Sequence, residues 1–374
     1  MKKSQKSLKV GLSMVGIATI LSTGAVAMAA GMGGGVMGGG GMGGSGFTSE
    51  EHLGRMLYFD KNLSSPPGQA CAACHLPQAG FADPDQDLPV SEGVIAGRFG
   101  GRNSPTSGYA SFSPTFTKDP VTGEYVGGQF WDGRAATLKD QAKGPFLNPV
   151  EMNNTEEGVV EAVRSSHYAD MFRAVYGSTS LDDVATAYDL IAQAIGVFEE
   201  SKQLNRFSSK YDSYLKKQVQ LTSSEAKGLK LFNQKCSGCH TSSSAGGVAA
   251  VFSAFTYENI GVPSNPAVIA LAGLPADYVD LGLGAIVDDP AEYGKFKVPT
   301  LRNIALTAPY THNGYFSTLK DVVHFHNTRA DGTWPAPEYA DTVTAKTGAM
   351  GLTDAQENDI VAFLLTLTDT LPGM

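Results

Sequence analysis

The sequence predicts a mainly α-helical protein of two domains that share one plan and contain long irregular loops. The pentapeptide Cys-x-x-Cys-His occurs twice, at 71–75 and 236–240, and the two copies use all four cysteines of the 374-residue chain. A segment containing leucine and phenylalanine precedes each copy and is expected to be helical. Segments with little helical periodicity follow each copy, and the first of them is rich in glycine and proline.

The two pentapeptides predict two covalently bound haem c groups, one in each domain. The two thiols of a motif add to the porphyrin vinyl groups, and the adjacent histidine becomes an axial iron ligand. These positions are Cys71, Cys74 and His75 in the first motif and Cys236, Cys239 and His240 in the second. A redox dithiol or half of a zinc site would explain a single Cys-x-x-Cys, but not two copies that each continue into histidine. Two cytochrome-c-like domains are therefore expected.

Residues 1–30 are typical of a secretory signal peptide. Four lysines within the first nine residues precede an apolar run at 10–21, and small residues near position 30 allow cleavage. The run is short for a membrane span and lacks a charged stop-transfer flank. Because haem c is attached outside the cytoplasmic membrane, the periplasm is the expected location.

Residues 31–46 form a Gly/Met-rich segment that is expected to be a flexible linker. Met32, Met37 and Met42 recur every five residues in it, and thioethers are soft ligands that suit Cu(I). An ordinary tether with incidental methionines and a copper-binding tail both remain open.

The chain is acidic, with a formal net charge of −9 that becomes −13 when residues 1–30 and their four lysines are removed. This charge argues against nucleic acid and anionic lipid as partners. It is compatible with a basic electron-donor protein. The mature length of about 344 residues suits two domains.

The N-terminal domain is predicted at 47–212 and the C-terminal domain at 213–374. Capping boxes that begin at Thr48 and Thr222 are expected to open the helices leading into the two haem motifs. The long irregular segment 78–128 is of a kind that is usually functional. The remaining expectations are helices at 155–175, 181–203, 317–327 and 354–368, a domain crossover at 208–220 and a long loop at 241–300.

From Leu53 to Leu371 the sequence resembles the bacterial di-haem cytochrome c peroxidases, a family that includes the MauG-type protein-oxidising enzymes. The blocks that carry the resemblance are LGRMLYFD, LPVSEGVIAG, GRNSPT and FWDGRAATLKDQAKGPFLNPVEM, then KGLKLFNQKCSGCH, VPTLRNIALTAPYTHNG and TLKDVVHF. The resemblance implies two cytochrome-c-like domains with a calcium ion between them. It also implies that peroxide reacts at the N-terminal haem, while the C-terminal haem receives and stores electrons.

The resemblance implies a catalytic pocket at the first haem, built from Glu151, Gln141 and Pro145, and a tryptophan between the haems, Trp131. Glu151 would take the first proton from peroxide and return it to the leaving oxygen. A carboxylate can do both when its pKa lies near the working pH. Taken alone, Glu151 would be a surface carboxylate and Trp131 a core aromatic. For calcium, the resemblance implies the ligands Asn103, Thr307 and Pro309.

The two haems are expected to differ in their sixth ligands. Many members of the family block the first haem with a histidine that precedes the RNSP motif. Here that loop contains none, and no histidine lies between His75 and His167. The first haem is therefore expected to be open without reductive activation, as in MauG-type proteins.

For the second haem, alignment of the TLKDVVHFHN helix places His326 where peroxidases have methionine and MauG-type proteins have tyrosine. A pair of imidazoles gives low-spin iron, and replacing a thioether with imidazole lowers the reduction potential. His324 and Met350 remain alternatives. His312 is expected to be structural, near the haem propionates.

Three functions follow from the sequence. The first is reduction of hydrogen peroxide with electrons from a small cytochrome c or cupredoxin. The second is a MauG-type enzyme that uses peroxide to oxidise side chains of a partner protein; the open first haem favours it, and the absence of the tyrosine ligand counts against it. The third is non-enzymatic electron transfer or copper-linked redox binding. Members of the family are often homodimers, so the resemblance allows a homodimer.

Overall fold

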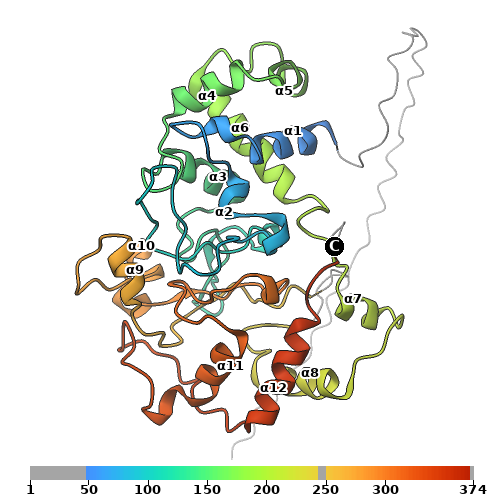
Figure 1. The fold of residues 1–374 in the computed structure, drawn as a ribbon, viewed down its shortest axis with the longest axis vertical. Coiled ribbons are helices and arrows are strands. Elements are labelled where there is room, and N and C mark those ends of the chain that lie inside the picture. The colour runs from blue at the N-terminus through green and yellow to red at the C-terminus, as the bar shows by residue number, and fades with distance from the viewer. Residues whose placement is uncertain (1–47, 243–249, 371–374) are drawn as a thin grey trace, which may run out of the picture. The chain divides into compact units, whose positions relative to one another are not determined.

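The computed structural model describes residues 48–242 and 250–370, which are mainly α-helical as predicted (Figure 1). The signal peptide, the Gly/Met-rich linker and its three methionines lie outside the described residues. The helices of the first half are α1 (Ser49–Tyr58), α2 (Cys71–Cys74), α3 (Leu138–Leu147), α4 (Glu156–Arg164), α5 (Ala169–Tyr176) and α6 (Val184–Glu199). Those of the second half are α7 (Lys210–Leu215), α8 (Ser223–Lys235), α9 (Pro266–Leu271), α10 (Leu283–Val287), α11 (Leu319–Thr328) and α12 (Asp354–Leu365).

Strands contribute little to the described part of the fold. Two antiparallel pairs of two residues each are formed, β1 (Thr117–Lys118) with β2 (Tyr125–Val126), and β3 (Tyr257–Glu258) with β4 (Phe296–Lys297). Short 3₁₀ helices lie at Lys61–Leu63, Pro77–Ala79, Ala110–Phe112, Pro290–Glu292, Ile304–Leu306 and Arg329–Asp331. No described helix is both long and apolar enough to cross a membrane.

Local capping chemistry determines where the predicted helices begin. The boxes at Thr48 and Thr222 are formed in full, so the starts of α1 and α8 are confirmed. Further boxes at Ser209 and Thr353 open α7 and α12. The helix expected at 155–175 is instead two helices, α4 and α5, and the one expected at 181–203 begins after Asp183, whose side chain caps Thr186.

The two halves repeat one helix crossing. In the first half α1 packs against α6, and in the second α8 packs against α12 (Figure 1). Each crossing has a glycine at the point of contact. A Cβ on Gly54 would lie 1.9 Å from the carbonyl oxygen of Ala194, and one on Gly228 would lie 1.9 Å from that of Asp359. Only a residue without a side chain lets the backbones approach so closely.

Each half has its own hydrophobic core. The first is built around α1, α4 and α6, and the second around α8, α11 and α12. Tyr211, in α7, packs into the second core. The predicted boundary between residues 212 and 213 lies inside α7, and it stays a prediction.

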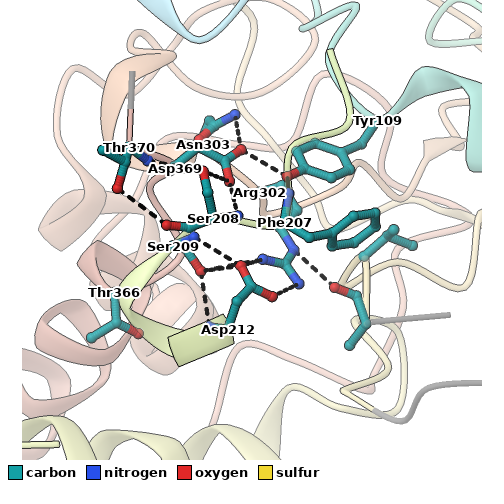
Figure 2. A network of polar contacts seen from close by, with 12 residues as sticks. Tyr109, Phe207, Ser208, Ser209, Asp212, Arg302, Asn303, Thr366, Asp369 and Thr370 are labelled. Carbon is teal, nitrogen blue, oxygen red and sulfur yellow. Dashed lines mark hydrogen bonds and ion pairs between the residues drawn. The ribbon is translucent and has the colours of Figure 1, made fainter. Parts of the chain in front are cut away.

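A buried polar network links the halves (Figure 2). The guanidinium of Arg302 is fully buried and donates to both carboxylate oxygens of Asp212, at 2.7 and 3.0 Å. Nearby, the hydroxyl of Tyr109 from the first half donates to Asp369 at 2.7 Å, and the Asp369 carboxylate also accepts from the backbone of Ser208 at 2.8 Å. The network thus connects the crossover at Ser208 and Asp212 and the C-terminal segment at Asp369 with both halves.

Candidate functional site

Both haem motifs present their histidine in the same way. The Nδ1 atom of His75 lies 3.2 Å from the carbonyl oxygen of Phe81, and that of His240 lies 2.9 Å from the carbonyl oxygen of Phe252. Both phenylalanines have positive φ, 62° and 56°. With Nδ1–H donating to a carbonyl, Nε2 is the free ring nitrogen in each case. Desolvation lowers the pKa of both imidazoles, which favours the neutral form that binds metals.

The thiols lie beside these histidines in two poorly solvated sites. The pKa of Cys71 and that of Cys74 are raised to about 12, mainly by desolvation. Nearby carboxylates contribute to the rise, Glu199 for Cys71, Asp83 for Cys74 and, more weakly, Glu151 for both thiols. Desolvation likewise raises the pKa of Cys236 to about 12. Since Glu151 acts on both thiols of the first motif, it lies within electrostatic range of the first haem site.

A cavity of about 520 Å³ opens at the second motif. Its lining includes Cys236, Cys239, His240, His326 and Met350. His326 is held in the neutral form, because burial and then the neighbouring His240 lower its pKa to about 4. Its buried Nδ1 atom has no hydrogen-bond partner among the described residues. Two neutral imidazoles and both thiols on one cavity fit a haem c group.

The two alternatives to His326 differ in position. Met350 lines the same cavity and remains available as a ligand. His324 instead directs Nδ1 to Glu357, at 3.0 Å, and its side chain is 50% exposed. The structure therefore brings His326 and Met350 to the second haem site and directs His324 to a carboxylate.

Helices α3 and α11 have the same start and differ at the position of the predicted iron ligand. Both α3 and α11 open with Thr-Leu-Lys-Asp, and in each the threonine hydroxyl caps the aspartate backbone N–H, at 3.2 and 3.1 Å. Seven residues after the leucine, α3 has Pro145 and α11 has His326. Proline has no side-chain atom that can ligate iron, whereas histidine has one. The same register thus carries a side chain that cannot ligate iron in one half and one that can in the other.

Glu151 lies in the turn after α3, and a hydrogen bond orients its carboxylate. The Nδ2 group of Asn148 donates to its Oε1 atom at 2.8 Å. Burial raises the pKa of Glu151, while the bond from Asn148 and the charge of Arg134 oppose that rise. The loop without histidine packs against its backbone, since the N–H of Val94 donates to the Glu151 carbonyl at 2.8 Å. Gln141 and Pro145 lie on α3 itself.

Trp131 is bonded to both halves of the chain. Its Nε1–H donates to the carbonyl of Asn103 at 2.8 Å, and its own carbonyl accepts from the backbone of Lys297 at 2.8 Å. It also lines the second haem cavity. Burial lowers the pKa of the Lys297 amine, which lines this cavity too, to about 7.

The three residues expected to bind calcium line one cavity, although one comes from the first half and two from the second. The Nδ2 group of Asn103 donates to the carbonyl of Pro89 at 3.1 Å, which assigns Oδ1 as the amide acceptor. One amide oxygen with the backbone carbonyls of Thr307 and Pro309 is a donor set that suits a hard cation.

His312 is part of a polar cluster, as a structural histidine would be. Its Nε2 atom lies 3.0 Å from Glu338, and its ring stacks on Phe296 with centroids 3.6 Å apart. Beside it Arg102 bridges Asp132, at 2.5 Å, and Asp280, at 2.6 Å.

Sequence reasoning missed several charged residues near the two sites. Arg102 and Asp280 are 178 positions apart in the sequence, so no local sequence pattern predicts their ion pair. Glu199 is buried in α6, where it raises the pKa of Cys71, and burial raises its own pKa to about 8. A carboxylate inside the apolar pattern of α6 was the available signal.

Comparison with known proteins covers both halves. The family model of the di-haem cytochrome c peroxidases matches residues 48–220, and that of cytochrome c matches residues 225–368. The chain is 39% identical over 341 residues to the methylamine utilization protein MauG of Paracoccus denitrificans, across 85% of this chain and 88% of the relative. It is 33% identical over 299 residues to cytochrome c551 peroxidase of Pseudomonas aeruginosa, across 79% and 77% of the two chains. The diheme peroxidase BthA of Burkholderia thailandensis has a similar structure, with a TM-score of 0.78 at 31% identity over 86% of each chain.

These matches confirm the predicted fold class and the two haem c groups that the paired motifs indicate. They also establish that the protein is an oxidoreductase. The chain, with its two haem motifs and its repeated helix crossing, belongs to the di-haem cytochrome c peroxidase family, in which MauG is also found.

Proposed function

We propose that this enzyme reduces hydrogen peroxide to water in the periplasm, with electrons from a small cytochrome c or cupredoxin. The observation that carries the proposal is the difference between α3 and α11, which have Pro145 and His326 in the same register. An open site suits a reaction with peroxide, and a site closed by two imidazoles suits electron transfer. When bound, the two haem c groups supply the redox chemistry, and two electrons and two protons convert one peroxide into two water molecules.

Glu151 is assigned the proton transfers. It takes a proton from one peroxide oxygen and returns it to the other, which leaves as water. Its raised pKa supports this role, because a carboxyl group exchanges protons best when its pKa approaches the working pH. Asn148 orients the carboxylate, and Gln141 and Pro145 complete the pocket wall.

Trp131 is assigned to the electron path between the haems. Calcium bound by Asn103, Thr307 and Pro309 is assigned the role of fixing the position of the two halves relative to each other. The bond from Trp131 to the carbonyl of Asn103 supports a link between these two roles. The net charge of −13 after removal of residues 1–30 supports a basic donor. A homodimer is compatible with this function.

A MauG-type enzyme, which would oxidise side chains of a partner protein, is the second candidate. The loop without a blocking histidine and the 39% identity to MauG favour it. His326 in place of tyrosine counts against full equivalence. Electron transfer without catalysis, or copper-linked redox binding, is the third candidate.

One experiment separates these functions. The diferric holoenzyme is mixed with hydrogen peroxide and then with reduced cytochrome c, without prior reduction. Rapid oxidation of the cytochrome supports the peroxidase. A persistent spectral change of the haems without oxidation of the cytochrome supports the MauG-type enzyme, and the absence of any reaction with peroxide supports electron transfer alone.

A further inference from the structure

A chain of aromatic rings leads from His326 toward the surface of the second half. The ring centroids of His326 and Phe325 are 6.3 Å apart, and those of Phe325 and Trp334 are 5.2 Å apart. The ring of His324, which is half exposed, lies 6.0 Å beyond Trp334. The series thus begins at the proposed sixth ligand of the second haem and ends at solvent.

Trp334 is held firmly within this series. Phe316 packs edge-on against it, with centroids 5.8 Å apart, and its Nε1–H donates to the hydroxyl of Thr328 at 3.0 Å. The side chain is half-buried and borders the second core. One face of the indole therefore contacts the core, while part of the ring remains accessible to a partner.

The aromatic side chains of this series differ in how easily they are oxidised. The benzene ring of Phe325 is hard to oxidise and can only mediate electron transfer between its neighbours, whereas an indole loses one electron far more readily. Trp334 and Trp131 are the two tryptophans of the chain. Trp131 lines the cavity at the second haem site, and Trp334 lies behind Phe325. Trp131 therefore borders the second haem site directly, whereas Trp334 lies between Phe325 and the half-exposed His324.

We propose that Trp334 is a redox relay through which electrons enter the second haem site from the donor. This proposal rests on the proposed function. Once the reaction with peroxide has withdrawn an electron from the second haem site, Trp334 supplies one electron to that site through Phe325 and His326, and its N–H proton stays hydrogen-bonded to Thr328. The donor is then oxidised by one electron and restores the indole. Two such cycles deliver the two electrons that one peroxide consumes.

The test compares holoenzyme variants Trp334→Phe and Trp334→Tyr with the unaltered protein. Phenylalanine keeps an aromatic ring but cannot relay, and tyrosine can. Oxidation of reduced cytochrome c by peroxide should slow at least tenfold in Trp334→Phe and recover to within about threefold in Trp334→Tyr. Phe59→Leu, which removes a ring that is 36% exposed in the first half, is the matched control and should have no effect.

Two readouts do not depend on turnover. The haem spectral change on adding peroxide without donor should have the same rate in all variants. Repeated peroxide without donor should leave oxygen covalently added to Trp334 in the unaltered protein, detected by peptide mass spectrometry. An unchanged rate of cytochrome oxidation in Trp334→Phe, or an unmodified Trp334, overturns the relay. If the unaltered protein shows no spectral change with peroxide, the proposed function fails and the relay with it.

Discussion

Pro145 and His326 hold equivalent positions in two helices that begin with the same four residues. One of these side chains can ligate iron and the other cannot, so a single position separates the two halves chemically. Close to the first haem site, the partly buried Glu151 and the buried Glu199 add two carboxyl groups with raised pKa values. The distinct roles proposed for the two haem sites depend on these few residues.

The role of Glu151 can be tested by substitution. Glu151→Gln keeps the shape but cannot move a proton, so the reaction with peroxide should slow by about 100-fold or more. The haem content should not change. Stopped-flow absorbance of the haems measures the rate, and Glu157→Gln, at an exposed position of α4, is the control. An unaltered rate in Glu151→Gln would remove this carboxylate from the mechanism.

Glu199 should make stability depend on pH. Its pKa rises from an ordinary 4.5 to about 8, so between these values the folded protein binds a proton that the unfolded chain releases. Stability should therefore fall as pH rises through this window. Glu199→Gln removes the effect and should stabilise the protein by about 1 kcal/mol or more at pH 8 but not at pH 4. Thermal unfolding at the two pH values checks this, with Glu157→Gln, at an exposed position of α4, as the control; equal gains at both would contradict it.

At the scale of elements, the predictable features were those encoded locally. The capping boxes of α1 and α8 lie within four residues of sequence, and both formed as predicted. Helix α3 was not expected, because Gly144 and Pro145 both disfavour helix and its support comes from packing on α6. The ion pair of Arg102 with Asp280 could not be predicted from the sequence either, because it depends on tertiary structure.

The shared register of α3 and α11 predicts that a ligand can be transplanted between them. Pro145→His places an imidazole in α3 where α11 has His326. The first haem should then become low-spin, and its reaction with peroxide should slow by about tenfold or more, because the open position is taken. Electron paramagnetic resonance and stopped-flow absorbance measure the two effects. Pro145→Ala should leave the first haem open; a low-spin signal in the alanine variant would refute the register argument.

At the scale of the whole molecule, buried polar side chains connect the two halves. The fully buried Arg302 is paired with Asp212 in the crossover, and Tyr109 reaches across to Asp369 (Figure 2). These partners are distant in sequence, and so the cytochrome-c-like halves were predictable from their motifs while their connection was not.

Removing one partner of this network should destabilise the protein. Asp212→Asn leaves the Arg302 cation buried without a full counter-charge, which costs about 3 kcal/mol. Chemical unfolding of the holoenzyme measures the loss. Asp170→Asn breaks an exposed ion pair with Arg173 and should leave the unfolding midpoint unchanged. A loss no larger than that of the control would mean that Arg302 finds other partners.

The central claim is that the two haems are unequal, one open beside Glu151 and one closed by His326. Electron paramagnetic resonance of the diferric holoenzyme tests it most directly. We predict one high-spin and one low-spin ferric signal in equal amounts, with only the low-spin signal lost or shifted in His326→Ala. Two low-spin signals in the unaltered protein, or a low-spin signal that His326→Ala does not change, would contradict the account.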